Sequence, residues 1–285
     1  MDIIKKKNYY YLKHSYRKGK KVITKEIYLG KAIPKNIEQI KKQFLTDLKK
    51  ELYVKLNQIK NNYSKEWKKY PSSIKKELLV DFSVNFTYNT NAIEGSTINK
   101  DETEDIIKRK ISPNKPLRDV QETINHSKTF LKMLNEKKNL NLSLLLKWHN
   151  DIFIDSKPDI AGKIRDYHVK VGDYICPDWQ DLKKLINEFF DWYKKNTSKE
   201  HPVELAALAH YKFIKVHPFG DGNGRITRLI TNFILHKKRF PLMVIEYKNR
   251  KSYYKALRKS DKEGETVFVK YFVRRYLTQY NRYLK

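Results

Sequence analysis

Residues 217–228 read His-Pro-Phe-Gly-Asp-Gly-Asn-Gly-Arg-Ile-Thr-Arg, a stretch that joins several groups suited to binding a nucleotide polyphosphate. His217 can accept a proton near neutral pH. Asp221 offers a carboxylate oxygen of the kind that Mg²⁺ prefers, which leaves the other positions of the metal for water and phosphate. Each of these groups alone is more often structural, but their occurrence in one short stretch indicates a nucleotide site.

The second half of the stretch supplies groups that bind anions. Gly222 and Gly224 flank Asn223 where a loop becomes a helix, so unhindered backbone N–H groups can point at an anion. Arg225 and Arg228 are three residues apart, hence on one helix face, and their guanidinium groups match phosphate oxygens. The chain has no G-x-x-x-x-G-K-[ST] loop, and a helical pattern rather than a strand precedes the stretch, which excludes the P-loop and dinucleotide-binding motifs.

The stretch matches the Fic motif, H-x-F-x-[DE]-[AG]-N-[GK]-R-x-x-R, at every specified position, and the likeness extends over about residues 74–280. The chain therefore resembles the Fic family, whose members are helical enzymes that mostly transfer AMP from ATP to a hydroxyl side chain of another protein. The resemblance implies a mainly α-helical fold, namely a Fic-type helical bundle with a short β-hairpin flap. It also implies an ATP-dependent protein adenylyltransferase activity (AMPylation).

The resemblance assigns a role to each matched residue. It implies that His217 is the base that deprotonates a Ser, Thr or Tyr hydroxyl of the target protein. It implies that Asp221 holds Mg²⁺, or Mn²⁺ in its place, between the α- and β-phosphates. The implied phosphate contacts are the α-phosphate with Gly222, Asn223 and Gly224, the β-phosphate with Arg225, and the γ-phosphate with Arg228. Family members that act as kinases carry Lys at the position of Gly224, so nucleotidyl transfer is expected rather than phosphoryl transfer.

A segment upstream of the motif predicts an inhibitory helix. Apolar residues recur at mostly helical intervals over about residues 74–94, and Gly95 is typical of a helix end. Thr90–Gly95 matches the family's inhibitory pattern, [ST]-x-x-x-E-[GN]. A carboxylate at Glu94 is unfavourable beside the negative end of a helix dipole, so it needs a cation. The resemblance supplies Arg228, with Glu94 as an off-switch and Thr90 setting the helix end.

Residues 166–177 predict a short hairpin, because apolar residues alternate around a Gly-Asp turn. In Fic proteins this hairpin is the flap, which pairs with an extended segment of the target. The implied flap residues are Val169, Lys170, Val171, Gly172, Asp173 and Tyr174.

The adenine is expected to lie near Tyr253 and Tyr254. Relatives often carry Asn eight residues beyond the first of these tyrosines, where this chain has Asp261. A carboxylate can accept a hydrogen bond from an exocyclic amine but cannot donate one, so the preference for adenine is left open. His210, on the apolar stripe of the preceding helix, is interpreted as a core residue rather than a metal ligand.

The composition limits the class of protein. The chain has 285 residues, a single cysteine, Cys176, and no apolar run long enough to span a membrane. These features and the lack of a signal peptide predict a cytoplasmic protein without a membrane partner.

The N-terminal quarter carries much of the charge. Of the net charge of +29, residues 1–70 contribute 20 Lys and Arg against 6 Asp and Glu. Residues 8–30 predict a basic β-hairpin that turns at residues 17–20, and a long amphipathic helix follows. We place a domain boundary at Pro71, which gives an appendage over residues 1–70 and a Fic domain over residues 71–285.

The sequence leaves two alternative functions and the oligomeric state open. The same site could remove AMP from a modified protein. The chain could instead be a basic nucleic-acid-binding or acidic-partner-binding protein with a regulatory Fic core, since clustered Lys and aromatic residues can bind polyanions. Whether the chain forms a homo-oligomer is also left open.

Overall fold

The computed structural model describes residues 1–18, 21–172 and 174–285, and it is mainly helical, as predicted. It divides into two compact units, Met1–Asn57 and Gln58–Lys285. Pro71 separates the first two helices, whereas the compact units divide earlier, inside the first of them. Among the described residues, no helix is both long and apolar enough to cross a membrane.

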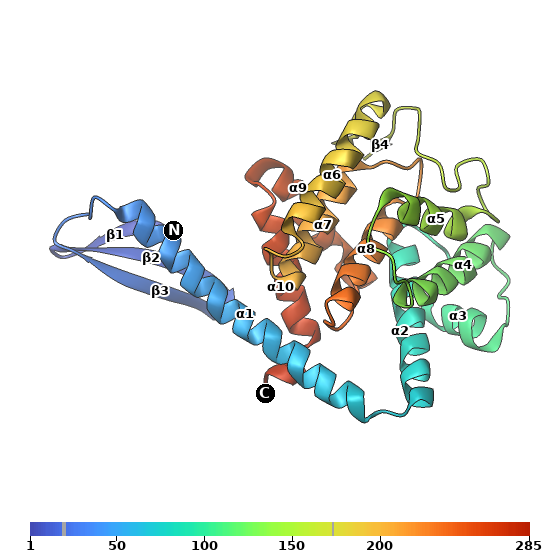
Figure 1. Ribbon diagram of the computed structural model, residues 1–285, viewed down its shortest axis with the longest axis horizontal. Coiled ribbons are helices and arrows are strands. Elements are labelled where there is room, and N and C mark those ends of the chain that lie inside the picture. Colours follow the sequence, from blue (N-terminus) through green and yellow to red (C-terminus); the bar gives the residue numbers. More distant parts are fainter. Residues whose placement is uncertain (19–20, 173) are drawn as a thin grey trace. The chain divides into compact units, whose positions relative to one another are not determined.

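The first unit contains a three-stranded antiparallel sheet in the order β1-β2-β3 (Figure 1). The strands are β1 (Asp2–Lys6), β2 (Tyr9–Lys18) and β3 (Lys21–Gly30). The predicted hairpin is confirmed as β2 and β3 but was incomplete, because Asp2–Lys6 pairs with β2 as a third strand. Of the predicted turn, Arg17 and Lys18 end β2, and Gly19 and Lys20 lie outside the described residues.

The first part of helix α1 (Ile37–Lys69) covers one face of this sheet. Leu12 is fully buried, and the His14 ring lies 6.5 Å from the ring of Phe44 in α1. Lys25 of β3 forms an ion pair with Glu51 of α1. On the other face, three side chains form an aromatic cluster: Tyr9, Tyr11 and Tyr28.

The second unit is a helical bundle in which α7 (Pro202–Val216) and α8 (Asn223–Lys237) pack against each other at the centre (Figure 1). The other elements surround this pair. They are α2 (Ser72–Ile93), α3 (Lys100–Glu104), the π-helical turn η1 (Asp105–Arg109), α4 (Leu117–Leu134), α5 (Leu142–Phe153), β4 (Lys170–Val171), β5 (Tyr174–Ile175), η2 (Trp179–Asp181), α6 (Leu182–Asn196), η3 (Tyr247–Asn249), α9 (Arg250–Glu263), α10 (Thr266–Gln279) and η4 (Asn281–Leu284).

The sequence explains why α7 and α8 form the centre. Pro202 occupies the first turn of α7, where its missing N–H costs no hydrogen bond. Small and apolar side chains follow, so the two helices approach closely, and both bury much of their surface, including Leu205, Ala206, Ala209, Phe213, Ile226, Leu229, Ile230 and Phe233. His210 is a core residue, as predicted: it is fully buried and contacts Thr231 at 3.0 Å and Tyr253 at 2.9 Å.

Helix α2 ends in a Schellman motif at Gly95. The N–H of Ser96 donates to the carbonyl of Asn91 at 3.0 Å, and the N–H of Gly95 donates to that of Ala92 at 3.2 Å. Gly95 adopts φ +91°, a conformation that favours glycine. This ending fixes the place of Glu94, the residue just before the glycine.

The last turns of α1 belong to the second unit and pack against the C-terminal segment. The Asn62 side-chain amide donates to the carbonyl of Tyr283 at 2.9 Å, and Glu66 pairs with Arg282 at 3.1 Å. The ring of Tyr63 lies 5.9 Å from that of Tyr283. Residues 58–69 therefore contribute to the helical bundle.

Candidate active site

A cavity of about 420 Å³ opens where the loop between α7 and α8 meets α9 and the β4–β5 hairpin. Its volume is in the range of sites for small ligands. It is lined by the predicted base, metal ligand and inhibitory residue and by most residues predicted to bind the nucleotide: His217, Asp221, Glu94, Gly222, Asn223, Gly224, Arg228, Tyr253, Tyr254 and Asp261.

Phe219 and Asn223 hold the loop in place. Phe219 is fully buried, and its ring stacks on that of His149 with the centroids 4.0 Å apart. The Asn223 side chain accepts from the N–H of Phe219 at 2.9 Å and donates to its carbonyl at 2.7 Å. Because both amide atoms of Asn223 serve the loop, its side chain has a bracing role here, and its contact with the α-phosphate stays a prediction.

His217 is held in the form that can act as a base. It is the residue after α7 and has a left-handed conformation, with φ +50°. Its Nδ1–H donates to the carbonyl of Ile214 at 3.2 Å, and Nε2 has no hydrogen-bond partner among the described residues. Burial lowers the pKa of the imidazole below its ordinary value, so the ring is neutral at pH 7 with Nε2 as the basic nitrogen.

Asp221 is ionised and surrounded by cations. The N–H of Gly222 donates to Oδ1 at 2.5 Å, while Oδ2 contacts Lys157 and, at 3.3 Å, the guanidinium of Arg225. Burial alone raises the pKa of this carboxyl, but Arg225 and Lys157 outweigh burial and lower the pKa to about 2. Asp221 therefore carries a full negative charge at neutral pH.

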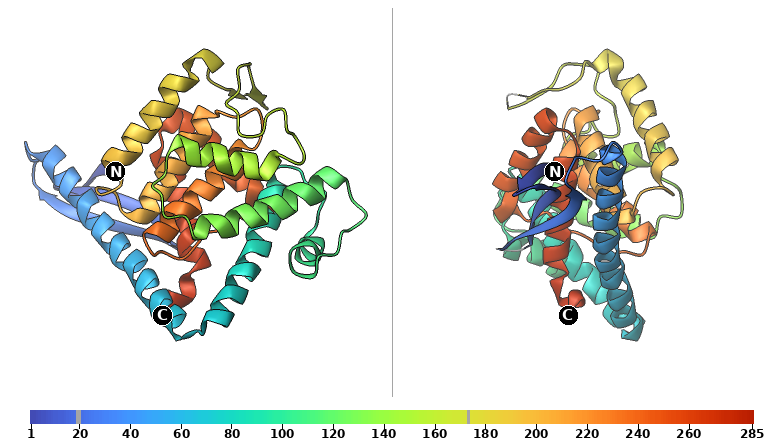
Figure 2. Two further views of the ribbon diagram at one scale, coloured as in Figure 1. Left: turned by 45° about the vertical axis from the view of Figure 1, so that its right-hand side comes forward. Right: turned by 90° about the vertical axis from the view of Figure 1, so that its left-hand side faces the viewer.

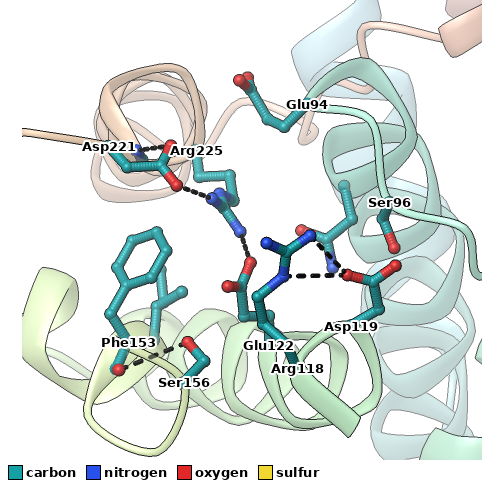
Figure 3. A network of polar contacts seen from close by, with 12 residues as sticks. Glu94, Ser96, Arg118, Asp119, Glu122, Phe153, Ser156, Asp221 and Arg225 are labelled. Atoms are coloured by element: carbon teal, nitrogen blue, oxygen red, sulfur yellow. Dashed lines mark hydrogen bonds and ion pairs between the residues drawn. The ribbon is translucent and has the colours of Figure 1, made fainter. Parts of the chain in front are cut away.

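Arg225 lies behind Asp221 rather than in the cavity. Its side chain is only 4% exposed and forms a hydrogen-bonded ion pair with Glu122 of α4 (Figure 3). Its guanidinium also lies 4.4 Å from the ring centroid of Phe153. The guanidinium of Arg225 is therefore already occupied by Glu122 and Asp221. Its predicted contact with the β-phosphate stays a prediction.

Glu94 and Arg228 form the predicted pair. The Arg228 guanidinium donates to Oε1 of Glu94 at 2.5 Å and to the carbonyl of Thr90 at 3.2 Å, and its Nε donates to the Thr90 hydroxyl. Oε1 lies directly over Gly224, where a Cβ atom would collide with it. The carboxylate thus occupies the space above the start of α8, where anions bind most favourably.

The predicted hairpin is confirmed as β4 and β5, which lie at the edge of the bundle (Figure 2), and its role as a flap that pairs with a target stays a prediction. Asp173, at its predicted turn, lies outside the described residues. Val171 and Ile175 are exposed, at 48% and 75%, as expected for strands that pair with another chain. The Tyr174 ring lies 3.3 Å from the ammonium of Lys215 in α7.

Arg165, whose role was not predicted, connects the flap to the base. Its buried guanidinium donates to the carbonyl of Tyr167 at 2.7 Å, to that of Pro177 at 2.7 Å and to that of His217 at 2.9 Å. Tyr167 and Pro177 flank the hairpin. One side chain therefore holds both ends of the flap and the backbone of His217.

The residues expected near the adenine fall into two groups. Tyr253 is buried with its hydroxyl on His210, whereas the Tyr254 hydroxyl donates to the carbonyl of Ile93 at 3.4 Å. Asp261 accepts from the hydroxyl of Tyr211 at 3.0 Å and pairs with Lys215 at 3.0 Å. Oδ1 of Asp261 is thus occupied, and the contact of this residue with a base stays a prediction.

The loop between α7 and α8 offers a divalent metal one carboxylate, that of Asp221. Within the described ranges, no group of three or more His, Cys, Asp or Glu residues could hold a metal ion. The ionised carboxylate of Asp221 on the wall of the cavity fits a Mg²⁺ ion that takes its other ligands from phosphate and water.

The sequence is similar to proteins of the Fic/DOC family. A sequence profile of the Fic/DOC family matches residues 139–235. The chain is 33% identical over 194 residues to protein adenylyltransferase Fic of Nematostella vectensis, covering 66% of this chain and 45% of that protein. It is 32% identical over 213 residues to protein adenylyltransferase fic-1 of Caenorhabditis elegans, covering 70% and 41%. The chain thus spans less than half the length of these relatives.

Solved structures have the same fold. A Fic domain containing signaling protein from Bacteroides thetaiotaomicron superposes with a TM-score of 0.70 at 26% identity, covering 80% of this chain and 96% of that one. Fic-1 from C. elegans superposes with a TM-score of 0.71 at 25% identity, covering 85% and 72%.

Proposed function

The chain belongs to the Fic/DOC family, and on that premise we propose that it is an autoinhibited protein adenylyltransferase. It transfers AMP from ATP to a Ser, Thr or Tyr hydroxyl of a target protein. One observation carries the proposal: a neutral His217 shares a cavity with an arginine, Arg228, that is occupied by the chain's own carboxylate, Glu94.

The chemistry follows from the position of His217. Its Nε2 takes the proton of the target hydroxyl, and the hydroxyl oxygen attacks the α-phosphorus of ATP. The bond from that phosphorus to the bridging oxygen breaks, and pyrophosphate leaves. A positioned general base contributes about 10²–10⁴ in rate. Arg165 keeps His217 and the flap in a fixed relation, so a target strand that pairs with the flap presents its hydroxyl near the base.

The phosphates bind at the start of α8. Gly222, at φ +78°, precedes the first N–H groups of that helix, which form a nest for an anion. Arg228 then provides a cation one turn along the helix. Mg²⁺ or Mn²⁺, when bound, neutralises phosphate charge and orients the polyphosphate, and Asp221 is the residue that would hold it.

Glu94 inhibits by occupying Arg228 rather than by the strength of the pair. The Arg228 side chain is only 3% exposed and that of Glu94 26%, so the cost of removing both charges from water offsets much of their attraction. Reversing a two-state population from 99:1 to 1:99 takes about 5.5 kcal/mol. The carboxylate, however, also lies over Gly224, so the phosphates of an aligned nucleotide meet a negative charge and lose a cation together. The penalty falls on the productive pose, and ATP can still bind in another.

Removal of AMP is a second candidate, because Glu94 lines the same cavity as His217. In that direction the carboxylate would orient a water molecule toward the α-phosphorus of a modified side chain. Both directions would use the same residues, and only the role of Glu94 would differ between them.

Incubation with α-³²P-ATP and Mg²⁺ tests the proposal. We expect Glu94→Gly to label itself or lysate proteins far more strongly than the wild type, with an added mass of AMP. The double variant Glu94→Gly/His217→Ala should lose this labelling. Equal labelling by the two variants would contradict the role of His217, and loss of label from pre-modified protein only in the presence of Glu94 would favour AMP removal.

A further inference from the structure

We propose that Lys157 is a built-in counter-ion for Asp221, and that a divalent cation must displace it. This inference rests on the proposed function, because it concerns the carboxylate that would hold the metal. It assigns to the loop after α5 a second inhibitory contact, separate from that of Glu94.

The ammonium of Lys157 lies on one carboxylate oxygen of Asp221, and the other oxygen accepts from the N–H of Gly222. The Nζ of Lys157 contacts Oδ2 of Asp221 and lies 3.9 Å from Oε1 of Glu122. The backbone N–H of Lys157 donates to the carbonyl of Phe153 at 2.7 Å, and its Nζ lies 5.6 Å from the centroid of the Phe153 ring. The backbone hydrogen bond to Phe153 and the contact with its ring thus fix the side chain of Lys157 next to Asp221.

The four charges of this cluster balance. Asp221 and Glu122 are the two carboxylates, and Arg225 and Lys157 are the two cations. Arg225 is only 4% exposed and is bonded to Glu122, whereas Lys157 is 27% exposed. Oε1 of Glu122 is buried without a hydrogen-bond partner in the described part of the chain. Lys157 is therefore the cation that can leave, and its departure leaves a net negative charge beside Asp221.

The two inhibitory contacts are complementary. Glu94 places a carboxylate on Arg228, where the proposed function puts a phosphate. Lys157 places an ammonium on Asp221, where it puts a metal. In each case a group of the chain carries the same sign of charge as the part of Mg·ATP that it would meet there. An entering metal thus meets both competition for Oδ2 and repulsion by a unit positive charge.

We predict that Lys157 weakens the effect of Mg²⁺ on the binding of the nucleotide. We define the metal ratio as the Kd of a non-hydrolysable ATP analogue in EDTA divided by its Kd in saturating Mg²⁺, both measured by calorimetry. In the Glu94→Gly background, Lys157→Met should raise this ratio by about 5- to 150-fold, the usual range for coupling between two bound ligands. Lys157→Arg keeps the positive charge and should stay near the parent value.

Two controls make the result decisive. Lys163 lies in the same segment between α5 and β4, and its ammonium donates to the carbonyl of Asp159. Lys163→Met should therefore not change the ratio. Asp221→Asn should bring the ratio close to 1. An unchanged or lower ratio in Lys157→Met overturns the inference about Lys157. A high ratio in Asp221→Asn overturns instead the role of Asp221 in the proposed function, so the two failures are distinguishable.

Discussion

At the scale of single residues, the ionisation of His217 determines the pH range of the reaction. Burial lowers the pKa of His217, and the base must be neutral to accept a proton. Activity should therefore rise as pH increases through this pKa and level off above it. In Glu94→Gly, kcat/KM plotted against pH should have an ascending limb with its midpoint below about 6.5, the ordinary value for histidine. A midpoint above pH 7 would contradict the assignment.

Gly222 tests how tightly the loop is packed. It has φ +78°, and a Cβ atom there would collide with the ring of Phe153. A residue forced into such a conformation costs about 1–3 kcal/mol, and the collision adds to this cost. Gly222→Ala should thus lower the free energy of unfolding in urea by more than Gly172→Ala, a glycine at φ +58° with open space around it. Equal losses in the two variants would mean that the ring moves freely.

The sequence predicted which residues lie at the site better than it predicted which side chains each of them contacts. His217, Asp221 and Arg228 lie close together because a short loop and helical spacing join them, whereas the pairing of Glu94 with Arg228 was supplied by the resemblance to the Fic family. The engagement of Lys157 with Asp221 was missed, since 64 residues separate them and no periodicity links them. The same holds for Glu122 and Arg225, which are 103 residues apart.

At the scale of elements, the inhibitory contact depends on how α2 ends. The Schellman motif at Gly95 holds Glu94 opposite Arg228. Gly95→Ala strains this ending by about 1–2 kcal/mol, because a Cβ disfavours the left-handed conformation. The strain should loosen Glu94 and raise self-labelling with ATP. Gly264→Ala is the matched control, since Gly264 also has φ +91° and open surroundings at the end of α9. Equal activation by both variants would show that the effect is not local to Glu94.

The sequence pattern predicted several helices and the flap hairpin but missed one strand. Apolar spacing at 3.6 residues indicated α2 and α7, and alternation around a glycine turn indicated the flap. Strand β1 was missed because Asp2–Lys6 has only two apolar residues and is recognisable only from its pairing with β2. Ile74 and Leu78, two of the apolar residues at the start of α2, are 39% and 36% exposed, because the buried part of this helix begins at Ser83.

At the scale of the whole molecule, the two compact units predict where the chain can be cut. Removing residues 1–57 leaves the last turns of α1 on the C-terminal segment, so the second unit should stay folded and active. Removing residues 1–69 also deletes Ile59, which is fully buried, and Tyr63, which packs on Tyr283. We expect a Tm near that of the full chain for the first truncation and a clearly lower one for the second, by calorimetry. A lower Tm for both truncations would mean that the first unit stabilises the second.

The charge of the first unit predicts a polyanion-binding role that is independent of catalysis. Residues 1–57 hold 16 Lys and Arg against 5 Asp and Glu, and residues 58–285 hold 45 against 27. The first unit thus carries +11 on 57 residues, and the second +18 on 228. Binding driven by phosphate neutralisation weakens steeply with salt. The full chain should therefore elute from heparin at higher salt than residues 58–285, and should bind single-stranded nucleic acid with a steeper dependence on salt. Elution of both proteins at the same salt concentration would assign the first unit a structural role, because its higher charge density would then contribute nothing to the binding of an anion.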